Sequence, residues 1–79
     1  MSNSALIAEL RMRAIETLRE STEMFEQARS QRKDGDLEGA RETEESARTK
    51  RADSAWLMNE ASKLEKASLP KDSPQNRTS

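Results

Sequence analysis

The chain has 79 residues, which suffices for one small domain. Charged residues make up 37% of it and aromatic residues only 3%, with Trp56 and Phe25 as the large rings. The 14 basic and 15 acidic side chains nearly cancel, so the net charge of −1 gives no reason to expect a polyanion or a membrane surface as partner. The chain contains neither histidine nor cysteine, which leaves no disulfide framework and removes the usual nucleophile–base pairs. We therefore expect no enzyme, no cofactor and no metal site.

The first residues, MSNSALIAEL, lack the basic start and the continuous apolar run of a signal peptide. No segment approaches the roughly 20 apolar residues that a membrane-spanning helix needs. These features predict a cytoplasmic protein.

The first predicted helix covers residues 4–33, with Ser4 as its N-cap and no Gly or Pro inside it. One small or apolar residue recurs every seventh position, and this series is Ile7, Ala14, Ser21 and Ala28. Larger apolar residues widen the apolar arc of this helix to about half of its circumference, which exceeds what packing against one other helix requires.

A turn is predicted at residues 34–36, because Gly35 can take the left-handed conformation that ends a helix and Asp36 can cap the next one. The second predicted helix covers residues 36–67. Its seam alternates steps of three and four and reads Ala40, Thr43, Ala47, Lys50, Ser54, Leu57, Ala61 and Leu64. Pro70 stops the helix, and residues 70–79 are predicted to be a disordered tail.

The two seven-residue series are mirror images about the turn. Folding the chain at Asp34–Gly35 brings small residues opposite each other in the pairs Ala28–Ala40, Ser21–Ala47, Ala14–Ser54 and Ile7–Ala61. Seven-residue spacing is that of packed helices, and small residues allow two backbones to approach closely. The sequence therefore predicts an all-α fold, a long antiparallel helical hairpin formed by residues 1–69.

A seam of Ala and Ser buries little apolar area, and isolated domains of this size seldom collect enough core. Together with the wide apolar arc of the first helix, this predicts a homodimer in which two hairpins form a four-helix bundle.

Two local resemblances concern the turn. Asp34, Asp36, Gly39 and Glu45 are spaced as in the calcium loop of the EF-hand family, which implies an oxygen-ligand calcium site. Glu38 and Arg41 depart from that pattern, and a helix end followed by a cap explains the same residues, so the turn is the favoured interpretation. Gly35, Ala40 and Ala47 also resemble the turn of a tetratricopeptide-type helix pair, which implies only a hairpin.

Nucleic-acid binding is a second hypothesis, since basic residues cluster on both sides of the turn: Arg29, Arg32, Lys33, Arg41, Arg48, Lys50 and Arg51. Glutamates at 38, 42, 44 and 45 alternate with them along the chain. We therefore expect no continuous positive stripe, and nucleic acid is the less favoured partner.

The leading hypothesis is a non-enzymatic protein-binding module, a small helical regulator, inhibitor or adaptor that docks on a larger protein and occludes its surface. Trp56 is the expected anchor, because tryptophan is over-represented among binding hot spots, although a second copy of the chain would cover it equally well. Ile15 and Leu18 of the first helix are expected on the same side as Ala55 and Met58 of the second, near the open end, as apolar support. Met12 is expected to point outward on the first helix. The candidate partner-binding residues are thus Trp56, Met58, Ile15, Leu18, Met12 and Ala55, with an RNA- or DNA-binding hairpin and a calcium-binding hairpin as alternatives.

Overall fold

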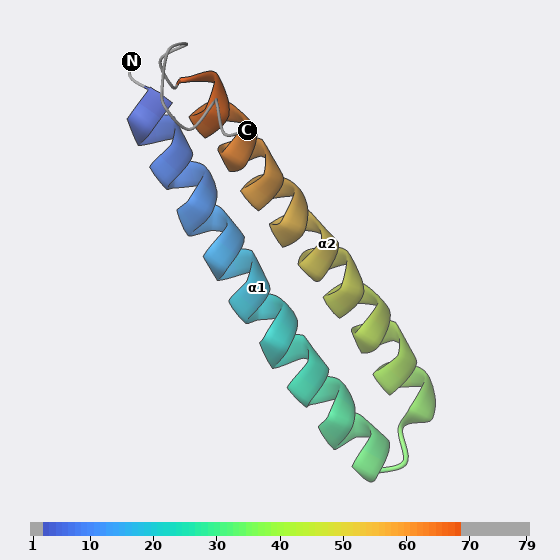
Figure 1. Ribbon diagram of the computed structural model, residues 1–79. Helices are drawn as coiled ribbons and strands as arrows, with labels where there is room; N and C mark the ends of the chain where they lie inside the picture. Colours follow the sequence, from blue (N-terminus) through green and yellow to red (C-terminus); the bar gives the residue numbers. More distant parts are fainter. Residues whose placement is uncertain (1–2, 69–79) are drawn as a thin grey trace, which may run out of the picture.

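The computed structural model describes residues 3–68, which form two helices packed as an antiparallel hairpin (Figure 1). Helix α1 comprises Asn3–Lys33 and helix α2 comprises Leu37–Ala67. Helix α1 begins one residue before the predicted N-cap, so Ser4 lies in its first turn instead of capping it. The tail predicted at residues 70–79 lies outside the described residues. Neither helix is long and apolar enough to cross a membrane.

The connection between the helices contains a glycine in a backbone conformation that would be strained for any residue with a side chain. Gly35 has φ of +88°, and its N–H donates to the Arg32 carbonyl at 3.1 Å while the Asp36 N–H donates to the Gln31 carbonyl at 2.8 Å. These two bonds form the Schellman motif that closes many helices at a left-handed glycine. The prediction that Gly35 ends the first helix is confirmed.

The N-cap of α2 follows in the next residue. The Asp36 carboxylate accepts a hydrogen bond from the Gly39 N–H at 3.0 Å, which satisfies one of the unpaired donors of the first turn. A Cβ atom added at Gly39 would overlap the Asp36 carboxylate, so this glycine leaves the space that the cap occupies. The three-residue turn is therefore complete without any ligand.

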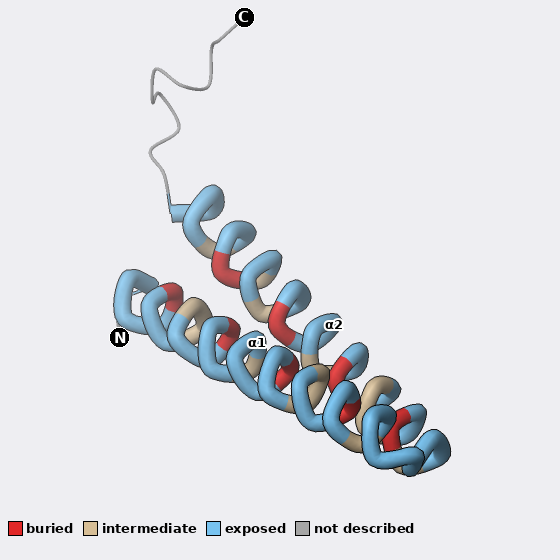
Figure 2. Tube along the Cα trace, turned by 90° about the horizontal axis from the view of Figure 1, so that it is seen from below, coloured by how far each residue is buried: buried red, intermediate tan, exposed pale blue. Residues whose placement is uncertain are grey.

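The buried residues of both helices form two facing lines, one on each helix (Figure 2). They are Ile7, Ala14, Ser21, Ala28, Ala40, Ala47, Ser54 and Ala61, all members of the two predicted seven-residue series. The second series is also expected to continue to Ser68, but that residue is exposed. Half-buried positions accompany them, including Thr43, Lys50, Leu57 and Leu64 on α2. The predicted small-residue seam is confirmed.

Two serine hydroxyl groups form hydrogen bonds across the seam. Ser21 Oγ donates to the Ala47 carbonyl at 3.0 Å, and Ser54 Oγ donates to the Ala14 carbonyl at 2.7 Å. A short side chain reaches the backbone of the opposite helix only when the two backbones are close, so these bonds report the close approach directly. They also confirm the predicted Ser21–Ala47 and Ala14–Ser54 pairs. The described residues contain no buried side-chain nitrogen or oxygen without a partner.

Candidate protein-binding faces

One side of the seam carries a row of side-chain pairs that span the two helices. Arg11 donates to Glu65 at 2.7 Å, Arg51 lies 4.8 Å from the centre of the Phe25 ring, and Arg32 donates to Glu44 at 2.6 Å. Successive positions in this row are seven residues apart on each helix. Leu18 and Met58 occupy the position between the Arg11–Glu65 pair and the Phe25–Arg51 pair. Both of these side chains are 45% exposed.

Ile15 and Ala55 lie three residues before Leu18 and Met58, which puts them on the same side of their helices. Ile15 is 57% exposed and Ala55 is also exposed. We call these four residues the apolar patch. The patch lies one heptad from the Arg11–Glu65 pair and one heptad from the Phe25–Arg51 pair, so it occupies the middle of the hairpin.

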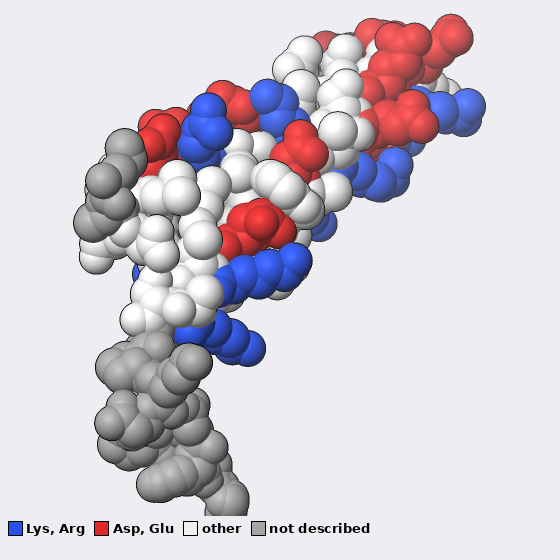
Figure 3. Space-filling model, turned by 90° about the horizontal axis from the view of Figure 1, so that it is seen from above, with Lys and Arg blue, Asp and Glu red and all other residues white. Residues whose placement is uncertain are grey.

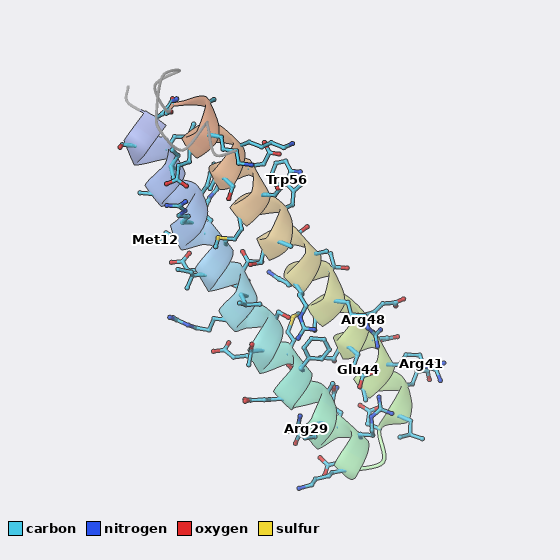
Figure 4. All side chains as sticks on the ribbon, in the orientation of Figure 1. Met12, Arg29, Arg41, Glu44, Arg48 and Trp56 are labelled. Carbon is cyan, nitrogen blue, oxygen red and sulfur yellow. The ribbon has the colours of Figure 1, made fainter. Side chains whose placement is uncertain are left out.

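Arginines surround the turn-side half of the same surface. One shallow depression there is lined by three arginines and two glutamates, together with Thr22 and Phe25: Arg29, Arg32, Arg51, Glu26 and Glu44. Arg41 and Arg48 each precede a member of the row by three residues, and Figure 4 shows them on α2 near Glu44, with Arg29 on α1. We call this side of the hairpin, with the apolar patch at its centre, the arginine face.

The arginine face is rich in arginine, but Glu26 and Glu44 line the same depression, so its positive charge does not form a continuous stripe. Glutamates alternate with arginines along the chain, and the helical repeat separates only some of them in space. Residues three or seven apart share a face, as Arg41, Arg48 and Arg51 do. Glu42 turns away from this face, whereas Glu45 lies beside it, three residues before Arg48. Lys50 does not belong to the arginine face, since it lies on the other side and pairs with Glu20 at 2.7 Å.

The opposite side of the seam collects carboxylates. A shallow hollow there is lined by both helices: Arg13, Glu16, Thr17, Glu20, Lys50, Asp53, Trp56 and Leu57. Further acidic residues continue the same side of the two helices, and these are Glu9, Glu23, Glu42 and Glu60. We call it the carboxylate face. In Figure 3, Lys and Arg gather along one edge of the visible surface and Asp and Glu along the opposite edge.

The carboxylate face contains one ion pair that changes a pKa. The hydrogen bond and the charge of Glu20 raise the pKa of Lys50 above its ordinary value of 10.5. Both side chains are substantially exposed to solvent, so the pair adds little to stability.

Trp56 belongs to the carboxylate face and not to the apolar patch. It is 60% exposed and lines the hollow with Leu57 and Lys50. Met12 is 62% exposed and projects from the outer side of α1, whereas Trp56 projects from the outer side of α2 (Figure 4). The six candidate residues are thus all exposed but do not form one surface, because the patch, Trp56 and Met12 face three directions.

The turn does not have the form of a calcium loop. An EF-hand loop wraps its ligands around the ion over twelve residues, but here α2 begins at Leu37, and Glu45 lies on a regular helix. The Asp36 carboxylate is engaged as the N-cap. Within residues 3–68, no three acidic side chains converge as a metal site would require.

Comparisons of the chain with protein-family models, with curated proteins and with solved structures find no match.

Proposed function

We propose that this chain is a non-enzymatic protein-binding module that docks on a larger protein through the exposed apolar side chains of its lateral faces. The observation that carries the proposal is the apolar patch, where Ile15, Leu18 and Met58 are between 45% and 57% exposed at the middle of a rigid two-helix surface. A patch of adjacent large side chains on a small hairpin is typical of a protein-interaction site.

The mode of action would be occlusion of the partner's surface. Over residues 3–68 the hairpin offers two helices whose surface hollows are shallow and open, and its arginines border the apolar patch on the turn side. A hydrophobic centre with a charged border is the usual composition of a protein-binding surface. Trp56 would provide a separate contact on the carboxylate face.

Site-specific photocrosslinking tests the proposal. A photoreactive amino acid at position 18 or 58 is expected to crosslink the same protein from a nuclease-treated extract, while the probe at Asn59, on the exposed back of α2, does not. The captured protein is then purified and titrated. Leu18→Ser and Met58→Ser are each expected to weaken its binding by tenfold or more, which corresponds to about 1.4 kcal/mol. Equal crosslinking from all three positions, or unchanged affinity, would refute the assignment.

Nucleic-acid binding remains a second candidate because of the arginine face. Its phosphate contacts would make the affinity fall steeply as salt concentration rises. Arg41→Ala with Arg48→Ala would then weaken binding and reduce the salt dependence, whereas Leu18→Ser would have little effect. A mobility-shift titration at two salt concentrations separates this candidate from protein docking.

A further inference from the structure

The two lateral faces of the hairpin carry opposite charge. On the arginine face, Glu44 and Glu65 are engaged by Arg32 and Arg11. Among the described residues, no carboxylate forms an ion pair with the other four arginines, Arg29, Arg41, Arg48 and Arg51, and Glu26 on this face forms none either. This face therefore has positive charge that the hairpin itself does not neutralise.

The carboxylate face has an excess of negative charge. Lys50 is engaged by Glu20 and Lys63 by Glu60. Within residues 3–68, Glu16 and Asp53 form no ion pair, although both line the hollow beside Trp56. Arg13 lines the same hollow and forms none either, but the carboxylates outnumber the cations there. The unneutralised negative charge of one copy thus matches the unneutralised positive charge of another.

The apolar residues of the two faces lie at the same height along the hairpin. Trp56 and Leu57 precede Met58 directly, yet Trp56 and Leu57 line the hollow on the carboxylate face while Met58 belongs to the apolar patch. A second copy in the same direction, shifted sideways, therefore brings Trp56 and Leu57 against the apolar patch. The same shift brings carboxylates against arginines.

A symmetric dimer through the arginine face would not achieve this match. If the two copies run in the same direction, arginines oppose arginines near both turns. If they run in opposite directions, the arginines of one copy oppose the open-end half of the other, where Glu65 is already paired with Arg11. Juxtaposed like charges disfavour the first arrangement, and the second leaves the arginines without free carboxylates opposite them.

We propose that copies of this chain associate side by side and in the same direction, with the arginine face of one copy on the carboxylate face of the next. This contact joins two different surfaces, so it leaves one free face of each kind at the ends of an assembly. A larger partner would bind at those ends. The inference rests on the proposed function in treating the exposed faces as binding surfaces.

Two charge-reversal variants test the contact. Arg41→Glu with Arg48→Glu reverses the arginine face, and Glu16→Lys with Asp53→Lys reverses the carboxylate face. None of these four side chains takes part in an ion pair between described residues, so both variants are expected to fold, as circular dichroism will verify. Arg19→Glu with Lys33→Glu is the control, because it makes the same charge change at exposed positions of α1 that line neither the arginine depression nor the carboxylate hollow.

Sedimentation of the purified, nuclease-treated chain is the measurement. We expect the wild type and the control to associate at 50 mM salt and to dissociate substantially at 0.5 M, where charges are screened within a few ångströms. Each face variant alone is expected to bind itself about a hundredfold more weakly, given the cost of opposed like charges. Their equimolar mixture is expected to regain association, since the two unchanged faces match and the two reversed faces are complementary as well.

Three results would overturn the inference: a monomeric wild type, a mixture that stays monomeric, or a variant that still dimerises with itself. Association that depends on nucleic acid would overturn it as well and would favour the second candidate function. Loss of self-association with the crosslinks from positions 18 and 58 intact would refute this inference alone. Loss of the crosslinks with self-association intact would refute only docking on a larger protein.

Discussion

Enlarging a seam residue is expected to destabilise the hairpin, although a larger apolar residue stabilises many helical interfaces. Ala47 is completely buried, and its carbonyl accepts the hydroxyl group of Ser21 at 3.0 Å. Leucine at this position adds three carbon atoms where no space is accessible. The two backbones must then move apart, or the side chain must adopt a strained rotamer.

The magnitude follows from two losses. Overpacking a well-filled site costs about 1–3 kcal/mol, and a buried hydrogen bond such as that of Ser21 contributes about 1 kcal/mol. We therefore expect Ala47→Leu to reduce the free energy of unfolding by about 2–4 kcal/mol. For a chain of this size that lowers the Tm by roughly 10 °C or more.

Thermal unfolding followed by circular dichroism measures this effect, at several protein concentrations so that any association is accounted for. Ala52→Leu is the matched control, because Ala52 is exposed on α2 and the same substitution there meets no opposing backbone. An Ala47→Leu protein as stable as the control, or more stable, would show that the seam can widen to the spacing of large residues. The alanines would then not be needed to keep the two helix backbones close together.

The remaining predictions concern the turn and one ion pair. Gly35→Ala should cost about 1–2 kcal/mol in urea unfolding, because alanine is strained at φ of +88°; an unchanged midpoint would contradict the left-handed geometry. Gly39→Ala should not yield the gain of about 1 kcal/mol usual for glycine-to-alanine changes inside helices, because its Cβ displaces the capping carboxylate, but it should yield that gain in an Asp36→Ala background. A double-mutant cycle in urea will show equal effects in both backgrounds if the cap is unimportant. Because the pKa of Lys50 is raised in the folded state, its contribution is present below pH 10.5 and lost as pH rises through the folded pKa. The Tm difference between wild type and Lys50→Met should accordingly be constant from pH 6 to 9 and shrink only in strong alkali, and a change near neutrality would contradict the Glu20 pairing.

The fold followed from the sequence because its main signals are local and periodic. The seven-residue series identified every buried position, and Gly35 with Asp36 identified the turn. Small residues carry unusual information here, since an alanine repeated at one helical position has no reason to recur on a solvent-exposed face. The start of α1 was less certain because Ser4 competes with neighbouring residues for the cap.

The charged faces were harder to predict because alternation along the chain conceals separation in space. Arg41, Glu44, Arg48 and Arg51 look mixed when they are read in order, and Glu44 stays on their face, where it pairs with Arg32. The signal was present in the spacing of three and seven residues between the arginines. Phe25 was likewise assigned only to the apolar arc, because its partner Arg51 comes from the other helix.

The repeated small residues have a consequence for the register of the two helices. If α2 slid along α1 by one heptad, small residues would still oppose small residues, for example Ser21 and Ser54, so the seam alone determines the distance between the helices but not their alignment. The alignment depends on the length of the turn at Gly35 and on the pairs at either end, Arg11–Glu65 and Arg32–Glu44. Insertions in this turn would therefore permit alternative alignments of an otherwise unchanged interface, and each would bring a different set of charges together on the two faces.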